Sequence, residues 1–373
     1  MPHKVLIVKS NLEPFREPFF SGLHRRLAAE GVALRVAVPG QRCGTYAGEW
    51  LIPVASREFR LFSKPVIWQD VRHLARGADL VIAQQGARQL ANYWLLLRRR
   101  EYGYQFALWG HGREFQRAWS TPLSEFVKRT VFRDVDYWFA YTPRVAGILA
   151  QAGYPADRIC AVYNSIDTRS EAALHRAVGE AEKQAVRERW SMAPSAALVS
   201  YCGALYRSKR MDLLVSACAA VRRAGIDLHL AIIGDGKERA KLERASARER
   251  WIHVVCSAYG REKARLLAAS AGMVIPGVVG LAVVDAFAHE CPLITTRTRG
   301  HGPEIEYLIG GINGLITSEN AAAFSSGIQR LLTDAALRRR LQQGCRESAA
   351  QITIENMIER FAQGVHAALR RAC

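Results

Sequence analysis

Residues 274–315 read VIPGVVGLAVVDAFAHECPLITTRTRGHGPEIEYLIGGINGL, and they give the clearest indication of the fold class. The apolar run that opens it breaks at Pro276-Gly277, and a helical pattern follows over 280–289. A second strand is predicted at 292–295. A strand, a glycine turn, a helix and a strand in this order let backbone N–H groups face a phosphate, while Asp285 near the helix start accepts a sugar hydroxyl. The layout favours a ligand that is nucleotide and carbohydrate at once.

Length and composition narrow the class of protein. At 373 residues the chain is too long for one ordinary hydrophobic core, and it suits two domains. Its 49% hydrophobic and 23% charged residues indicate a soluble globular protein, and no apolar run approaches the roughly 18–20 residues that cross a bilayer. The apolar run at 5–8 is too short for a signal peptide and predicts a first β-strand.

Cysteine and histidine spacing gives no sign of a metal. The eight cysteines are scattered without a CxxC pair, and the ten histidines show no HxxxH or similar ligand spacing. Several cysteines lie in apolar strands, so we expect reduced core thiols in a cytoplasmic protein. No structural metal is expected.

Strand and helix patterns alternate along both halves of the chain. Strands separated by helices of 10–15 residues predict parallel sheets covered on both faces. We therefore expect an α/β protein with two Rossmann-like domains facing each other across a cleft. The expected parts are an N-terminal domain at 1–170, a polar linker at 171–192, a second domain at 193–350, and a helix at 351–373 that crosses back to the first domain.

The formal charge of +18 has three explanations. The first is a solvated basic face. The second is nucleic acid, but no helix-turn-helix, RNA-recognition or zinc signature appears, so we expect no such partner. The third is an anionic membrane surface, where each basic residue contributes roughly 1 kcal/mol. Residues 98–100 are three arginines and residues 113–133 mix arginines with aromatic side chains, which suits a membrane interface or a core helix with a solvated face.

Glycine turns follow three predicted strands of the second half, at Gly203, Gly234 and 277–280. Neither GxGxxG nor GxxxxGK[ST] occurs, which excludes a dinucleotide fingerprint and a P-loop. Three such turns on one carboxyl edge favour a ligand site. Lys209 lies six residues beyond Gly203, where a cation can reach a diphosphate, and Arg207 can share that charge. The alternative is a surface lysine, although a cation is unfavourable at a helix start.

Further candidates follow strands of the first half. His111, in WGHGRE, comes directly after a predicted strand at 106–109, and Asn164 ends another strand. Glu304 follows a proline in a loop, either near the ligand or as an acid favoured at a helix N-terminus. The DxD of residues 134–136 has two interpretations. A site for a divalent ion is the less favoured one, because an acid at this position more often ends a helix–strand turn.

Together these residues resemble the retaining glycosyltransferases of family 4, which have the GT-B fold and use nucleotide-sugar donors. The resemblance covers nearly the whole chain and is strongest over 199–316. The matching pieces are Gly203…Lys209, the GDG turn at 234–236, Pro303–Ile305, Asn313–Leu315, His111-Gly112 and Asn164–Asp167. The amino-acid sequence around 276–287 and 301–308 resembles that of a subgroup associated with bacterial surface polysaccharide assembly.

The resemblance implies a role for each candidate. Lys209 would bind the donor diphosphate, His111 the donor sugar and Asp285 the ribose hydroxyls, and these three form the expected catalytic set. Glu304 would lie by the phosphates and the sugar. The expected donor-binding set is Gly203, Arg207, Gly234, Gly277, Gly280, Leu281, Glu304 and Asn164.

The chain departs from the family pattern at several positions. The family's two glutamates separated by seven residues correspond to Gly277 and Asp285, so the usual carboxylate contact to the donor sugar is missing. This departure makes a donor sugar with altered or missing hydroxyls plausible. The arginine usual after the first glycine is Ala204, with Arg207 as its replacement, and residues 13–16 stand where the family has a glycine pair.

The expected reaction is transfer of a sugar, with retention and without a metal or cofactor, from a nucleotide-sugar to a saccharide or lipid-linked saccharide. Fixed positive charge, from Lys209 and the dipole of the helix near Gly280, would stabilise the leaving diphosphate. The expected place is the cytoplasm, with a peripheral position on the inner face of the membrane as a hypothesis. The rivals are a sugar-nucleotide 2-epimerase of the same fold and a nucleic-acid-binding protein.

Overall fold

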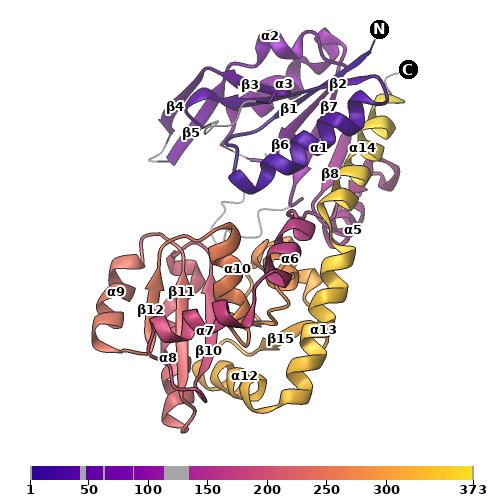
Figure 1. The fold of residues 1–373 in the computed structure, drawn as a ribbon. Coiled ribbons are helices and arrows are strands. Elements are labelled where there is room, and N and C mark those ends of the chain that lie inside the picture. Colours follow the sequence, from indigo (N-terminus) through magenta and orange to yellow (C-terminus); the bar gives the residue numbers. More distant parts are fainter. Residues whose placement is uncertain (1, 43–47, 62–63, 87, 113–133, 372–373) are drawn as a thin grey trace. The chain divides into compact units, whose positions relative to one another are not determined.

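The computed structural model describes residues 2–42, 48–61, 64–86, 88–112 and 134–371. Its contacts divide the chain into two compact units (Figure 1). The first unit comprises residues 1–166 and 354–373, and the second comprises residues 167–353. Each unit has a parallel sheet of its own.

The first unit contains a seven-stranded parallel sheet in the order β3-β2-β1-β6-β7-β8-β9. Its apolar strands are buried because helices cover both faces. The strands are β1 (His3–Val8), β2 (Val32–Pro39), β3 (Leu51–Val54), β6 (Leu80–Gln84), β7 (Gln105–Gly110), β8 (Tyr137–Ala140) and β9 (Ile159–Ala161). The helices are α1 (Glu17–Ala28), α2 (Arg72–Ala75), α3 (Leu90–Tyr102), α5 (Pro143–Gln151) and α14 (Ile354–Leu369), with short 3₁₀ helices η1 (Pro14–Arg16), η2 (Gly40–Arg42) and η3 (Ala156–Arg158).

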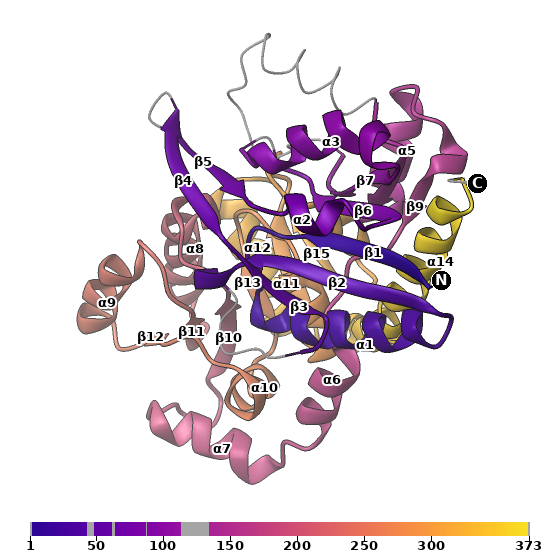
Figure 2. The ribbon, with the colours of Figure 1, turned by 90° about the horizontal axis from the view of Figure 1, so that it is seen from above.

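An antiparallel hairpin of β4 (Ser56–Leu61) and β5 (Lys64–Gln69) stands apart from this sheet (Figure 2). The sequence pattern did not predict the hairpin, β3, α2 or α5. Their apolar runs are short, and hairpin pairing of this kind leaves only a weak period in the sequence.

The last helix, α14, returns to the first unit, as expected from the sequence, and lies beside α1 (Figures 1 and 2). Phe361 on α14 stacks on Phe139 with ring centroids 4.4 Å apart, and its centroid is 5.2 Å from that of Trp109. Arg26 of α1 forms an ion pair with Glu359 at 2.8 Å. The C-terminal helix therefore completes the core of the first unit.

The second unit contains a six-stranded parallel sheet in the order β12-β11-β10-β13-β14-β15. The strands are β10 (Ala197–Cys202), β11 (Leu228–Ile233), β12 (Ile252–Val255), β13 (Met273–Ile275), β14 (Leu293–Thr296) and β15 (Gly314–Thr317). The helices are α6 (Thr168–Arg176), α7 (Glu180–Arg189), α8 (Met211–Arg223), α9 (Arg239–Arg248), α10 (Gly260–Ala268), α11 (Ala282–Ala288), α12 (Ala321–Thr333) and α13 (Ala335–Gln351), with 3₁₀ helices η4 (Arg207–Lys209) and η5 (Pro303–Tyr307). Both units thus have the Rossmann-like strand order, with the first strand near the middle.

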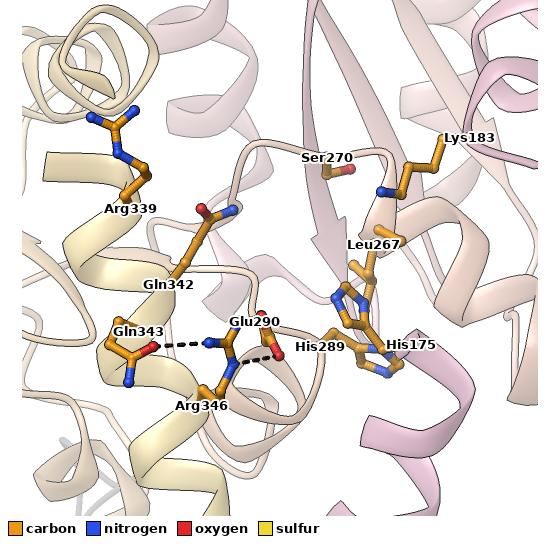
Figure 3. A pocket seen from close by; sticks show the side chains of 11 residues that line it. His175, Lys183, Leu267, Ser270, His289, Glu290, Arg339, Gln342, Gln343 and Arg346 are labelled. Atoms are coloured by element: carbon orange, nitrogen blue, oxygen red, sulfur yellow. Dashed lines mark hydrogen bonds and ion pairs between the residues drawn. The ribbon is translucent and has the colours of Figure 1, made fainter. Parts of the chain in front are cut away.

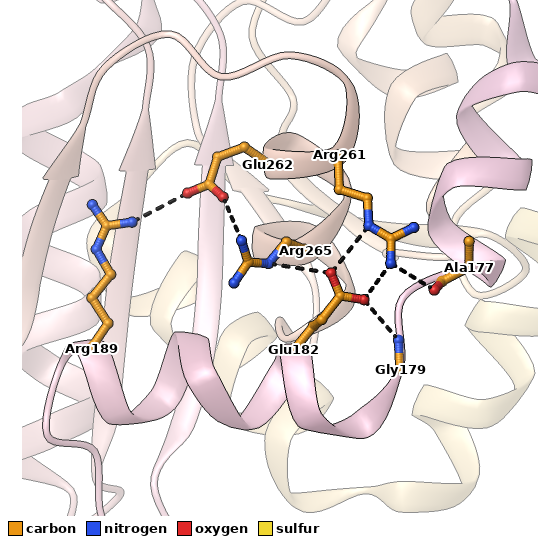
Figure 4. A network of polar contacts seen from close by, with 7 residues as sticks. All are labelled: Ala177, Gly179, Glu182, Arg189, Arg261, Glu262 and Arg265. Atoms are coloured by element: carbon orange, nitrogen blue, oxygen red, sulfur yellow. Dashed lines mark hydrogen bonds and ion pairs between the residues drawn. The ribbon is translucent and has the colours of Figure 1, made fainter.

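The segment expected as a linker, 171–192, forms α6 and α7 and belongs to the second unit. Glu182 of α7 accepts hydrogen bonds from Arg261 of α10 at 2.5 and 3.1 Å, and Arg189 forms an ion pair with Glu262 at 3.2 Å (Figure 4). The polar composition that suggested a linker is therefore the charged surface of two packed helices. The N-terminal segment of the first unit ends at residue 166, four residues before the expected boundary.

Candidate functional site

The carboxyl edge of the second sheet is built from glycine turns that contact one another. Gly203 and Gly234 have φ values of +146° and +152°, which side chains rarely adopt. A Cβ on Gly234 would lie 2.0 Å from the carbonyl oxygen of Gly203, and a Cβ on Gly236 would lie 2.5 Å from that of Leu205. These glycines are therefore required for the loops after β10 and β11 to pack together, whatever they bind.

Gly277, the position of the missing family acid, also has no room for a side chain. A Cβ there would lie 2.2 Å from the carbonyl oxygen of Ser208 and 2.6 Å from the Cα of Lys209. The backbone of η4 occupies the space where a glutamate side chain would start. The departure seen in the sequence thus follows from the close approach of two loops.

Lys209 lies against the loop between β13 and α11. Its Nζ donates to the carbonyl oxygen of Val278 at 2.6 Å, and the Val278 N–H donates to Ser208 at 3.0 Å. Burial lowers the pKa of Lys209. Arg207, on the same 3₁₀ helix, is exposed. The two cations expected to bind a diphosphate are therefore at the carboxyl edge of the sheet.

His301 joins two of these loops, and the sequence interpretation gave it no role. Its Nδ1 accepts the N–H of Val279 at 3.0 Å, and its Nε2 lies 2.7 Å from the carbonyl oxygen of Thr296. Burial lowers the pKa of His301, which matches a neutral ring with the proton on Nε2. The signal was present as a histidine between glycines at 300–302, the same context that singled out His111.

Glu304 is buried, with 3% of its surface exposed, at the start of η5. Its Oε2 lies 2.7 Å from the position of a Cβ on Gly302 and 3.9 Å from that of a Cβ on Gly280. The carboxylate therefore faces the same glycine loops as Lys209. The proximity to the phosphates and the sugar that the resemblance implies for Glu304 stays a prediction.

Asp285 is engaged in an ion pair that the sequence did not predict. Its Oδ1 accepts from Nζ of Lys263 on α10 at 2.8 Å, and Lys263 also contacts Glu171 at 3.0 Å. Burial disfavours the charged ammonium, but the two carboxylates outweigh it and raise the pKa of Lys263. Any ribose contact of Asp285 would therefore be made by a carboxylate that Lys263 already orients.

Three possible metal ligands, Glu171, Asp285 and His289, come close together at this place. The ammonium of Lys263 contacts both carboxylates, at 3.0 and 2.8 Å. Since a cationic side chain already neutralises these acids, the cluster gives no separate reason to place a metal ion here.

The helix after Gly280 is shorter than the sequence pattern indicated. α11 begins at Ala282 and ends at Ala288, and Leu281 is its N-cap residue. A helix of seven residues has fewer aligned peptide dipoles than the expected helix, so the charge of Lys209 carries more of any phosphate stabilisation.

The carboxyl edge of the first sheet has a different construction. His111 follows β7, and its ring lies edge-on to Tyr141 with centroids 4.4 Å apart. Burial and the charge of Arg16 lower the pKa of His111 to about 4, so the ring is neutral at pH 7. Among the described residues, nothing donates to or accepts from its Nδ1.

Asn164 is held inside the first unit. Its Oδ1 accepts from Nη2 of Arg16 at 2.6 Å, and Nη1 of Arg16 donates to the carbonyl oxygen of Ser165 at 3.2 Å. Both side chains are almost completely buried. The amide expected to contact the donor thus has a structural partner, and Arg16 is a residue that the sequence interpretation mentioned only as a departure.

Arg16 and Lys9 place two buried cations around one aromatic ring at this edge. The guanidinium carbon of Arg16 lies 5.6 Å from the Trp109 ring centroid, and Lys9 Nζ lies 5.3 Å from it. Burial lowers the pKa of Lys9 to about 8, although Glu13 at 3.2 Å opposes the shift. Cation–π contact helps to compensate for the lost hydration of both groups.

The DxD of residues 134–136 has a structural role. Arg99 contacts Asp134 at 2.8 Å and Asp136 at 3.3 Å, and the Phe106 N–H donates to Asp136 at 2.8 Å. The acids hold α3 to the start of β8 and β7, which supports the turn interpretation over the metal interpretation. Arg99 itself is buried and is not part of a basic face.

The other basic and aromatic stretch, 113–133, lies outside the described residues. Its helix, expected at 123–133, and its aromatic side chains Phe115, Trp119, Phe126 and Phe132 are therefore not placed. Among the residues that the structure does describe, every helix is too short or too polar to cross a bilayer.

Known families match both units. Residues 19–170 match the family model described as Glycosyltransferase Family 4, and residues 196–334 match Glycosyl transferases group 1. The chain belongs to the glycosyltransferases of the GT-B fold. The two matches together span more than three quarters of this glycosyltransferase and meet the expectation from the resemblance.

Individual relatives agree with the family. The GDP-mannose-dependent alpha-(1-6)-phosphatidylinositol dimannoside mannosyltransferase of Mycobacterium tuberculosis is 32% identical over 119 residues, but the match spans only 30% of this chain and 30% of that enzyme. EpsD of Bacillus subtilis, described as a glycosyltransferase, is 24% identical over 97% of this chain and 96% of its own. The crystal structure of Anabaena HepE in complex with UDP has a TM-score of 0.72 and 13% identity, covering 98% of this chain and 99% of HepE, which shows the shared fold.

Proposed function

We propose that this glycosyltransferase moves a sugar from a nucleotide-sugar to a saccharide or lipid-linked saccharide, with retention and without a metal. The observation that supports it most directly is the position of Lys209. Its Nζ donates a hydrogen bond of 2.6 Å to the carbonyl oxygen of Val278 in the loop after β13. A cation fixed beside a glycine loop at the carboxyl edge of a parallel sheet suits a diphosphate.

The proposed role of Lys209 follows from the charge of the leaving group. Breaking the bond between sugar and nucleotide leaves negative charge on the diphosphate. An ammonium that is positioned beforehand stabilises this charge without reorganisation, and such stabilisation is usually the largest catalytic contribution. Arg207, exposed on the same 3₁₀ helix, is available to share the charge.

The proposed donor specificity depends on Gly277. A side chain with a carboxylate does not fit at this position, because backbone atoms of η4 would lie 2.2–2.6 Å from a Cβ on Gly277. The hydroxyls that the family acid would accept from must then be bound by other groups or be absent. We expect the preferred donor to carry a modified or deoxygenated sugar at that place.

The proposed acceptor site lies in the first unit. His111, a neutral hydrogen-bonding group of the same unit, is proposed to contact the donor sugar, as the resemblance implies. The mannosyltransferase relative is named for a phosphatidylinositol dimannoside acceptor and a GDP-mannose donor, and HepE was crystallised with UDP. These proteins support a saccharide acceptor and a nucleotide donor here. A role in cell-surface polysaccharide synthesis at the inner face of the membrane extends the same proposal.

A thermal-shift panel of UDP, GDP and their sugar conjugates tests the proposal, because a bound ligand raises stability by mass action. At least one nucleotide should raise the Tm of the wild-type protein, and Lys209→Ala should abolish most of that rise. Lys241→Ala is the matched control, since Lys241 is an exposed lysine on α9 of the same unit. No rise with any nucleotide, or an equal rise in Lys209→Ala, would contradict the proposal. Product analysis with the stabilising donor then tests whether the configuration of the sugar is retained. Repeating the reaction with a chelator tests whether transfer proceeds without a metal.

A further inference from the structure

A cavity of about 340 Å³ opens in the second unit among α6, α7, α10 and α13 (Figure 3). Its residues include the ends of α10 and α11, where the chain enters β13 and β14. These are the amino ends of the parallel strands. The glycine loops and Lys209 follow the carboxyl ends of the same sheet, so the cavity is separate from them. Its wall residue His289 comes close to Asp285.

Two histidines form one wall of the cavity. His289 is fully buried, and its Nε2 lies 3.1 Å from the Glu171 carboxylate. Its ring is 5.8 Å from that of His175, and Figure 3 shows the two rings side by side. Within the described chain, Nδ1 of each ring is buried without a hydrogen-bond partner. Both nitrogens have almost no solvent-accessible surface, so an occupant of the cavity does not contact them.

The remaining charges around the cavity are mostly positive. Lys183 extends into it from α7 (Figure 3). Its ion-pair partner Glu180 is a surface residue with 88% of its side chain exposed. Arg339 makes no hydrogen bond or ion pair with any described residue. Arg346 is paired with Glu290 at 2.6 Å. Among the residues that line the cavity, the three cations Lys183, Arg339 and Arg346 exceed the single acid, Glu290, by two, which matches a doubly charged anion.

A metal ion is a poor occupant for the same reason. Imidazole nitrogens bind zinc and related metals, but the ammonium of Lys183 and the guanidinium of Arg339 line the same cavity. Their charge repels a cation and attracts an anion.

We propose that this cavity is a second binding site, for a phosphate group, either as free phosphate or on a small phosphorylated molecule. Lys183 and Arg339 supply the charge, and Gln342 adds an amide that points into the cavity (Figure 3). A hydrogen phosphate carries several acceptor oxygens for these donors. The cavity volume leaves room for a group beyond the phosphate.

The test is a thermal-shift titration of the full chain with sodium phosphate, at an ionic strength held constant with sodium chloride. We expect a saturable rise in Tm of a few degrees, as for a ligand at several times its Kd. The double variant Lys183→Gln/Arg339→Gln should lose the rise. The control, Lys241→Gln/Arg330→Gln, removes two exposed cations of the same unit and should keep it.

The Lys209→Ala protein separates this site from the candidate donor site. It should keep the full response to phosphate, whether or not the proposed sugar transfer is correct. Loss of the response in Lys209→Ala, its persistence in Lys183→Gln/Arg339→Gln, or no response beyond chloride in the wild type would each overturn the proposal.

Glucose 6-phosphate in place of phosphate identifies the source of the group. A half-saturating concentration several-fold below that of phosphate assigns the site to phosphorylated small molecules. Equal values assign it to the free ion. Both results support the phosphate site, provided that the Lys183→Gln/Arg339→Gln protein loses the response.

Discussion

The two sheets present their carboxyl edges in different ways. In the second unit, the edge consists of backbone packed on backbone, with Gly234 against Gly203 and Gly277 against η4. In the first unit, the edge consists of buried polar and aromatic side chains, with Arg16 and Lys9 around Trp109. The edge of the second unit therefore tolerates almost no added volume, whereas the edge of the first unit depends on satisfied charges.

The largest effect should come from Lys209→Ala, because it removes the charge that the second edge positions. We expect turnover to fall by about 100-fold or more, as when one preorganised donor is removed from an active site. The lost hydrogen bond to Val278 should cost only about 1 kcal/mol of folding stability. Steady-state kinetics and chemical denaturation measure the two effects, and kinetics like those of the wild type would remove Lys209 from the mechanism.

Gly234→Ala tests the packing of the second edge. The added Cβ would meet a carbonyl oxygen at 2.0 Å in a backbone conformation with φ +152°, so we expect a loss of about 3 kcal/mol. Gly225→Ala is the matched control, since Gly225 has φ +88° but nothing within 4 Å of a Cβ, and it should lose about 1 kcal/mol. If urea denaturation gave similar losses of stability for the two variants, the positive φ, rather than contact with neighbouring atoms, would explain why Gly234 must be a glycine.

Arg16→Gln tests the side-chain construction of the first edge. It shortens a buried, charged donor that contacts Asn164 and Ser165, so unfolding should become easier by about 2 kcal/mol. Arg25→Gln, an exposed arginine on α1, should change the stability by less than about 0.5 kcal/mol. Equal effects of the two substitutions would refute a structural role for Arg16.

The pH dependence of stability tests the burial of His111. Its pKa is about 4 in the folded protein, against 6.5 for an ordinary histidine, because burial disfavours the charged ring. The unfolded chain therefore binds the proton more tightly, and stability present above pH 6.5 is lost as the pH falls towards 4. His111→Asn should remove about 2 kcal/mol of the loss between pH 7 and pH 5. If the stability of His111→Asn depended on pH in the same way as that of the wild type, the burial of His111 would be contradicted.

The smallest effect is expected from Asp134→Asn. The carboxylate is largely exposed, and Arg99 keeps Asp136 and a backbone carbonyl as partners, so the stability loss should be about 0.5–1 kcal/mol. Turnover should stay within about twofold of the wild type, with or without a chelator. A large loss of turnover that added divalent metal restores would revive the metal interpretation of the DxD.

Much of the candidate site could be predicted from local sequence, and the failures have physical causes. Gly203, Lys209 and Glu304 were found because turns after parallel strands meet at one edge. The ion pair of Asp285 with Lys263 was missed because its partners lie 22 residues apart on two helices, with no pattern linking them. The hydrogen bond from Arg16 to Asn164 was missed because the two residues are 148 positions apart, and the donor contact of Asn164 stays a prediction.

The α/β class, the two parallel sheets, the C-terminal helix and the family could be predicted from the amino-acid sequence, since these depend on local periodicity and short motifs. Which polar side chains are already paired, and which glycines are needed for packing, became visible in the folded protein. It also showed that the polar segment at 171–192 is part of the second unit. These properties depend on contacts between residues far apart in the chain, and the order of amino acids does not display such contacts.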